Sequence, residues 1–265
     1  MNKRRTVVSA VVGALGLGLV TVFGIPAAQA AREDCGDLPN PPAKPVQEAQ
    51  NEENPNIQND YDEVVEEDTR PGVVYLAVIG GDTPKPNKCG LNPSNPPAEW
   101  TGWGGPLDGD NVTIGEGAGT RNEIVIGGVY FKRGIGTHAP ARLVYDLTGG
   151  DYRKFEAYVG MSDEKDPAEC GHGGSSEFIF NVDGKEMFAS GVLMGTEGGM
   201  NVDPVKVEFE IPAGARELEI VITDGGDGNG CDHSTIGDAK LLTAAALSVD
   251  PAGKLTTTWG TLKAR

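Results

Sequence analysis

The chain contains three histidines, and each lies in a glycine-rich stretch rather than in an apolar run. They are His138 in "RGIGTHAPARL", His172 in "CGHGGSS" and His233 in "GNGCDHSTI". An imidazole can transfer protons, bind a metal or form hydrogen bonds to a ligand. A single histidine is more often structural, but binding residues gather in loops that a rigid scaffold positions. We therefore predict that His138 and His233 contact a ligand or shape its pocket.

A short acidic loop precedes His233. Residues 224–232 read "DGGDGNGCD" and place carboxylate and amide oxygens on a glycine scaffold. Hard oxygen ligands on a tight loop suit calcium, and the predicted ligands are Asp224, Asp227 and Asn229. The spacing is not that of an EF-hand, and a turn capped by Asx side chains is the open alternative.

Two tryptophans in "EWTGWGG" are candidates for stacking against a sugar ring. An indole packs well on the apolar face of a sugar while polar groups hold the hydroxyls. Trp103 is the predicted platform, whereas Trp100 is expected to cap the core.

Signatures of catalysis are weak. The chain has no G-x-S-x-G sequence, so a serine nucleophile of the α/β-hydrolase type is unsupported. The glycine-rich "GEGAGT" does not open a helix and is not a phosphate-binding loop. Carboxylates are so abundant that a glycosidase pair stays open as an alternative.

The N-terminus has the pattern of a secretory signal peptide. A basic start precedes an apolar stretch from about residue 7 to residue 23, and "AQA" at residues 28–30 is a small-residue cleavage pattern. We predict cleavage after Ala30 and an extracellular protein, with no second membrane-spanning candidate.

Net charge limits the partners. The chain carries −17, and removal of the three positive residues of the signal would leave about −20. Phosphate backbones and anionic lipid surfaces attract clustered Lys and Arg, so neither nucleic acid nor a membrane surface is an expected partner. Neutral ligands and divalent cations remain compatible with this charge.

The four cysteines predict two disulfides in an exported chain. Three pairings are possible. We favour Cys170–Cys231, because both lie in glycine-rich loops of one domain, which leaves Cys35–Cys89 to hold the N-terminal segment.

The remaining pattern predicts one β-domain. Residues 31–71 are rich in Pro, Asn and acidic residues and read as an extended linker. Residues 72–243 contain short alternating segments such as "SEFIFNVDG" and "VKVEFEI", separated by Gly, Asp, Asn and Pro. Many short strands without an amphipathic helix predict an all-β sandwich in a single domain. Residues 244–265 are expected to form a frayed tail or a peripheral strand.

Three stretches resemble the NPCBM family of domains: "GGVYFKRGIGTHAPARLVYDLTGGDYRKFEAYVGMSDE", "SSEFIFNVDGKEMFASGVLMG" and "LEIVITDGGDGNGCDHSTIGDAKL". The resemblance implies a jelly-roll sandwich like that of galactose-binding domains, which binds galactose-type sugars, carries a structural calcium and accompanies glycoside hydrolases. By position in these motifs it implies His138, Asp232 and His233 as sugar-binding residues, with Trp103 as the platform.

One departure from the family pattern bears on function. The family usually has a tryptophan three residues after the second histidine, where this chain has Ile236.

We predict a secreted, non-catalytic carbohydrate-binding protein that works with a separate glycoside hydrolase. The alternatives are an interaction protein that has lost its sugar site and a small glycosidase using carboxylates.

Overall fold

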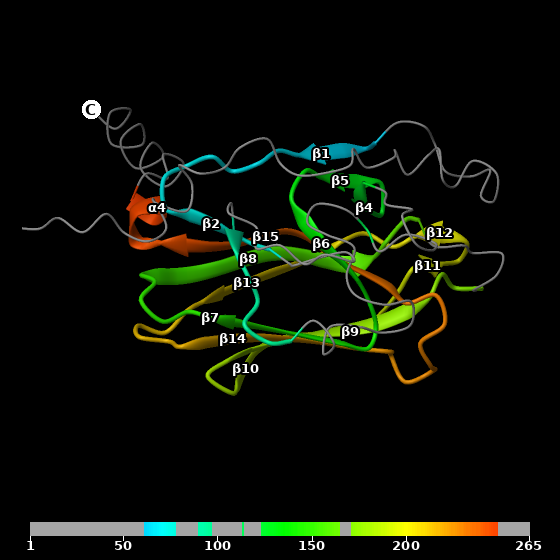
Figure 1. Cartoon of the computed structure of the whole chain (residues 1–265). Helices are drawn as coiled ribbons and strands as arrows, with labels where there is room; N and C mark the ends of the chain where they lie inside the picture. Colours follow the sequence, from blue (N-terminus) through cyan, green and yellow to red (C-terminus); the bar gives the residue numbers. More distant parts are fainter. Residues whose placement is uncertain (1–60, 78–89, 97–112, 114–122, 165–170, 249–265) are drawn as a thin grey trace, which may run out of the picture.

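The computed structural model describes residues 61–77, 90–96, 113, 123–164 and 171–248. In these ranges the regular secondary structure is almost entirely β-strand, and two sheets pack face to face, as Figure 1 shows. None of the helices in these ranges is long and apolar enough to cross a membrane. The fold is the predicted all-β sandwich, of the jelly-roll type found in galactose-binding domains.

One layer is a six-stranded sheet in which β13, β8, β15, β2 and β3 follow one another, and β6 pairs with β15 beside β2. Its strands are β2 (Val73–Leu76), β3 (Gly90–Leu91), β6 (Gly134–His138), β8 (Tyr152–Met161), β13 (Val205–Glu210) and β15 (His233–Thr243). All pairings are antiparallel except that of β2 with β3.

The other layer is a four-stranded antiparallel sheet with the order β10, β9, β14, β7. Its strands are β7 (Ala141–Asp146), β9 (Ser175–Val182), β10 (Lys185–Met194) and β14 (Glu217–Thr223). A hairpin turn joins β9 to β10, and its residues Asp183 and Gly184 both have positive φ.

The core lies between the two layers. Alternation along β14 buries Leu218, Ile220 and Ile222 while the residues between them stay partly exposed. Across the interface, Phe155 of the six-stranded sheet packs against Phe180 of the four-stranded sheet, with ring centroids 5.3 Å apart. These contacts fix the spacing of the layers and hold the loops at their ends in place.

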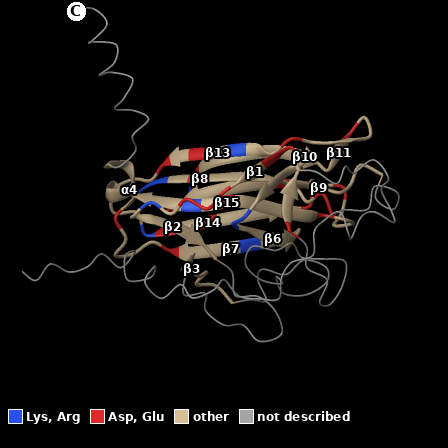
Figure 2. Ribbon diagram, turned by 90° about the horizontal axis from the view of Figure 1, so that it is seen from above, with Lys and Arg blue, Asp and Glu red and all other residues tan. Residues whose placement is uncertain are grey.

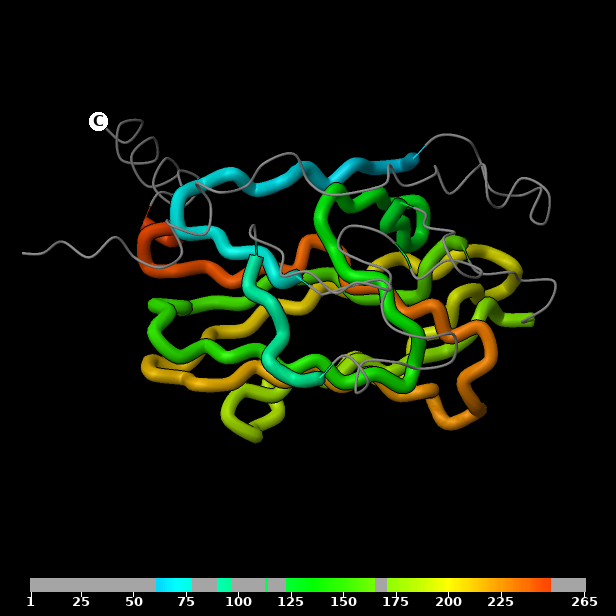
Figure 3. The backbone as a smooth tube through the Cα atoms, in the orientation of Figure 1, coloured from blue at the N-terminus to red at the C-terminus, as the bar shows by residue number. Residues whose placement is uncertain are grey.

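Strand β15 is buried along its whole length. Leu242 near its end packs with Val73, Tyr75 and Ala246, and a third element covers its middle, where Phe131 lies against Gly237. This element consists of β4 (Ile124–Ile126) and β5 (Val129–Phe131), and β1 (Glu63–Val65) pairs in parallel with β5. Figure 3 shows the segment that contains β1, in cyan, crossing above the orange trace of β15. The expected linker therefore ends earlier than residue 71, because residues 61–71 pack on the domain.

Three smaller elements complete the described chain. A hairpin of β11 (Thr196–Glu197) and β12 (Met200–Asn201) follows β10. After β15 the chain forms helix α4 (Ala244–Ser248), in which Ala246 is buried. The expected tail thus begins as a short helix rather than as a frayed segment or a strand.

The outer side of the six-stranded sheet carries paired charges at its β13 edge. Lys154 of β8 contacts both Glu156 and Glu208, each with an N–O distance of 2.8 Å, and Lys206 of β13 also contacts Glu208. Figure 2 shows acidic and basic residues mixed along β8 and β13. Such exposed pairs contribute little each to stability and keep this side solvated.

Candidate functional site

The predicted site residues converge on one end of the sandwich. Strand β6 ends at His138 and β15 begins at His233, and these two residues face each other in the ladder. Strand β8 ends nearby at Met161, and β9 begins at Ser175. Antiparallel pairing therefore brings together residues that lie almost one hundred positions apart in the sequence.

Both histidines are strand residues and both are buried, with 1% and 3% of their surface exposed. This differs from the expected placement in exposed loops. The centroids of the His138 and His233 rings are 5.5 Å apart, and Nδ1 of His138 lies 2.7 Å from the carbonyl oxygen of Ala139. Burial lowers the pKa of His138, and the neighbouring His233 lowers it further.

Glu164 is a member of this cluster that sequence reasoning missed. Its carboxylate lies 2.9 Å from Nδ1 of His233, and its other oxygen accepts a hydrogen bond from the hydroxyl of Thr113. The side chains of His233 and Glu164 are 4% and 0% exposed. A carboxylate on one imidazole nitrogen fixes the ring orientation and determines which nitrogen faces the other way.

Asp232 is buried beside this pair. Its Oδ1 accepts a hydrogen bond of 2.8 Å from the backbone N–H of Ser175, and Oδ2 has no hydrogen-bond partner among the described residues. Burial, and to a smaller extent the carboxylates of Asp227 and Asp224, raise the pKa of Asp232 to about 7. A buried acceptor with spare capacity is a group that a ligand hydroxyl can satisfy.

The loop from Asp224 to Asn229 is held by hydrogen bonds. Asp227 accepts a hydrogen bond of 2.8 Å from the Ser175 hydroxyl and lies 3.2 Å from Nε2 of His172. Asp224 Oδ1 accepts the N–H of Gly226 at 3.1 Å, which is an Asx turn.

Two of the predicted calcium ligands, Asp224 and Asp227, already accept hydrogen bonds in this structure. In the described ranges no three His, Cys, Asp or Glu side chains gather closely enough to hold a metal. Calcium also takes amide and backbone oxygens as ligands, so calcium binding by Asp224, Asp227 and Asn229 stays a prediction.

Gly174, just before β9, lies close to the backbone of Cys231 in the loop before β15, and its replacement gives a testable prediction. Its φ is +76°, and a Cβ there would lie 2.1 Å from the carbonyl oxygen of Cys231. Gly174→Ala should therefore lower the free energy of unfolding by more than about 3 kcal/mol, from strain and overpacking combined. Gly226→Ala is the matched control, because its φ is also positive but no atom lies within 4 Å. It should cost about 1 kcal/mol in the same urea titration, and equal losses would contradict the steric argument.

The remaining predicted site residues divide into two groups. Ile236, at the position of the family tryptophan, is fully buried in the main core and pairs with Ile135 and Val159. Ile236 is therefore a core residue. A tryptophan at this buried position would not be exposed for stacking on a sugar, so the substitution removes no surface binding residue. Cys231 is disulfide-bonded. The other predicted residues lie outside the described ranges; they are Trp100, Trp103, Cys35, Cys89 and Cys170.

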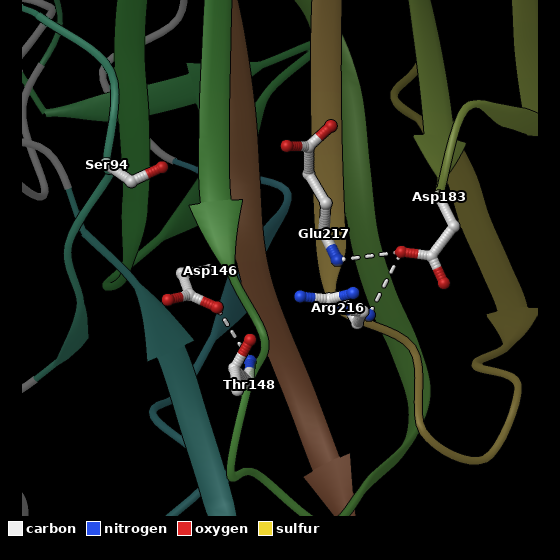
Figure 4. Close-up of a pocket in the computed structure, with 6 residues that line it drawn as sticks. All are labelled: Ser94, Asp146, Thr148, Asp183, Arg216 and Glu217. Carbon is white, nitrogen blue, oxygen red and sulfur yellow. Dashed lines mark hydrogen bonds between the residues drawn. The ribbon is translucent and has the colours of Figure 1, made fainter.

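A recess of about 480 Å³ lies at the opposite end of the sandwich, shown in Figure 4. Its carboxylates stabilise the turns around it by accepting backbone hydrogen bonds. Asp183 accepts the N–H groups of Arg216 and Glu217, and Asp146 accepts that of Thr148. No aromatic or histidine side chain is among its six described lining residues. We therefore place the candidate site at the histidine end.

Known proteins are similar to this chain over part of its length. The chain is similar to a protein of Renibacterium salmoninarum named "Putative endo-alpha-N-acetylgalactosaminidase", with 26% identity over 147 residues. The match covers 56% of this chain but only 9% of that relative, so the chain spans about a tenth of its length.

Two solved structures are also similar. One is the CBM51 module of Clostridium perfringens GH95 in complex with methyl-galactose, with 33% identity, 53% of this chain and 90% of that chain covered, and a TM-score of 0.37. The other contains the tandem CBM51 modules of a family 98 glycoside hydrolase from Streptococcus pneumoniae, with 27% identity, 43% and 33% covered, and a TM-score of 0.38. The family model of the NPCBM/NEW2 domain matches residues 91–242, which is more than half of the sequence. The chain therefore belongs to the NPCBM/NEW2 domain family.

Proposed function

We propose that this chain is a secreted, non-catalytic carbohydrate-binding protein that recognises a galactose-type sugar at the histidine end of the sandwich. Its family membership makes the domain a carbohydrate-binding module. The observation that carries the assignment to this end is the buried polar cluster of His138, His233 and Glu164, with the buried Asp232 next to His233 in the chain. Such groups can hold sugar hydroxyls in fixed directions.

The choice of sugar rests on similarity. The relative from Renibacterium salmoninarum carries the name of an enzyme that acts on an N-acetylgalactosamine linkage. Galactose-configured sugars are therefore the class to test first, and a separate glycoside hydrolase is the proposed partner. The basic and apolar N-terminus supports export, as does the disulfide at Cys231, because disulfides persist in oxidising compartments.

The interaction-protein alternative depended on Ile236 having replaced a sugar-stacking tryptophan. Because Ile236 is part of the core, this feature no longer favours it. The glycosidase alternative is tested by incubating the chain with a labelled galactoside, and the proposal expects no hydrolysis.

The proposed site is tested by substituting His138 and measuring methyl-galactose binding by calorimetry. His138→Ala should weaken binding at least tenfold, because it removes the ring from the buried cluster. His138→Asn is the safer variant for folding, since its amide can still donate a hydrogen bond to the carbonyl of Ala139. It should bind equally weakly while it unfolds cooperatively.

Arg216→Ala, in the recess at the far end, is the matched control and should bind like the wild type. Unchanged binding by folded His138→Asn would overturn the assignment of the site.

A further inference from the structure

Strand β15 carries a buried hydroxyl whose hydrogen-bonding capacity the fold does not use. Thr235 is fully buried, and its Oγ1 has no hydrogen-bond partner in the part of the chain that the structure describes. The hydroxyl of the preceding Ser234, by contrast, lies 2.7 Å from that of Ser176. Burying a hydroxyl without a hydrogen bond costs free energy, so an unsatisfied group of this kind calls for an explanation.

Thr235 lies on the same side of the six-stranded sheet as the two histidines. Its neighbour Ile236 points into the core between the sheets, so Thr235 points to the outer side. His233 and Gly237, two positions away in either direction, share this outer side, and Phe131 of β5 lies against Gly237. The Thr235 side chain therefore stands next to that of His233, about 6.7 Å along the strand.

The strand pairing also places this hydroxyl near His138. In the ladder between β6 and β15, Thr235 faces Gly136, and His138 lies two positions further along β6 on the same side. On its other flank Thr235 pairs with Gly160, and a Cβ there would lie 2.4 Å from Cγ2 of Ile126. The unsatisfied hydroxyl thus lies between an aliphatic wall on the β8 side and the imidazoles at the end of the strand. A mainly apolar lining with a few polar groups at fixed positions is typical of sites for small ligands.

A purely structural role would favour a different residue at this position. Valine has the branched shape of threonine and would fill the same space in a buried strand without an unsatisfied polar group. The Thr235 hydroxyl therefore adds nothing to the packing of the free protein. What it adds is a group that can both donate and accept a hydrogen bond.

The hydrogen bond between His138 and Ala139 determines what the imidazole offers to a ligand. The carbonyl oxygen of Ala139 can only accept, so Nδ1 of His138 donates to it over 2.7 Å. Burial lowers the pKa of His138, which favours the neutral ring, and in that form Nε2 is an acceptor. A ligand hydroxyl that donates to Nε2 can still accept a hydrogen bond on its oxygen, and Thr235 supplies a donor.

We propose that Thr235 is a further sugar-binding residue of the site, and that one sugar hydroxyl bridges Nε2 of His138 and Oγ1 of Thr235. This inference rests on the proposed function and deepens it, because it gives each hydrogen bond a direction. The sugar hydroxyl donates to the imidazole and accepts from the threonine.

Calorimetric titration of Thr235→Val and Thr235→Ser with methyl-galactose tests this assignment. Thr235→Val should bind about tenfold more weakly than the wild type, because it removes one hydrogen-bond donor and keeps the shape. Its urea midpoint should not fall, since the substitution also removes an unsatisfied buried group. Thr235→Ser keeps the hydroxyl and should bind like the wild type. Thr243→Val, at a buried position at the other end of the same strand, is the matched control and should leave the affinity unchanged.

Monodeoxy forms of methyl-galactose identify the bridging hydroxyl. The wild type and Thr235→Val should differ about tenfold in affinity for each of them except the one that lacks this hydroxyl, which both proteins should bind equally weakly. A difference that persists for every deoxy sugar would contradict the bridging hydrogen bond.

The outcomes separate this inference from the function on which it rests. Equal affinities of the wild type and Thr235→Val for methyl-galactose would overturn the role of Thr235 and leave the histidine site standing. Weak binding by Thr235→Ser would also overturn it, because the hydroxyl would then not be the group that the sugar requires. If the wild type does not bind methyl-galactose, the proposed function falls and this inference falls with it.

Discussion

The substitution His233→Ala is expected to lower the free energy of unfolding by about 3–5 kcal/mol. The reason is that the side chain of Glu164 has no solvent-exposed surface and its carboxylate lies 2.9 Å from the His233 ring. Removing the ring leaves this carboxylate buried beside a cavity, without its contact to His233. Urea denaturation followed by tryptophan fluorescence measures the loss.

A double-mutant cycle separates the energy of the His233–Glu164 interaction from the cost of the cavity left by the ring. Glu164→Gln keeps the shape of the side chain and removes its charge, so the cost of His233→Ala should shrink by about 2 kcal/mol in that background. If the cost is the same in both backgrounds, the two side chains do not interact and the buried pair is not part of the site.

The second large effect is a dependence of stability on pH that comes from Asp232. Its carboxyl has a pKa of about 7 in the folded state, against 3.8 for an aspartate in an unfolded chain. Between these values the folded state binds more protons than the unfolded state, so this group lowers stability as pH rises. The contribution is complete above about pH 7 and reaches at most about 4 kcal/mol.

Carboxyls with lowered pKa values increase stability as pH rises and so oppose the effect of Asp232. The prediction therefore concerns the difference in stability between the wild type and Asp232→Asn. The pKa of Glu208 is lowered to about 2 by its hydrogen bonds with Lys154 and Lys206, which stabilises the fold as pH rises. Asp232→Asn cannot ionise and should gain stability relative to the wild type between pH 4 and pH 7. Parallel pH profiles for the two proteins would show that Asp232 does not titrate in this window.

The sandwich was predictable because most of its strands are buried on one face only. Phe178, Phe180 and Val182 alternate with polar residues, and the structure buries these three as β9. Strand β15 was not predicted, because both of its faces are covered and its sequence "HSTIGDAKLLT" shows no alternation. The element that covers it includes β1, which has only three residues and is held mainly by its pairing with β5.

Only those residues of the candidate site that lie in the glycine-rich motifs could be predicted from the sequence. His138, Asp232 and His233 sit in glycine-rich motifs, and the structure places the three together. Glu164 could not be found in the same way, because it lies in the acidic run "SDEKD" and meets His233 across 69 positions. The role of Ile236 also needed the structure, since only its burial distinguishes a core residue from a lost platform.

An NMR titration of the isotopically labelled chain with methyl-galactose tests the proposed sugar site. All three histidines of the chain lie at the proposed end, so their side-chain resonances report on that site. We expect saturable shifts for His138 and His233, together with the amides of Ser175 and Asp232, and none at Asp183 or Arg216. No shifts at millimolar sugar, or shifts confined to the opposite end, would contradict it.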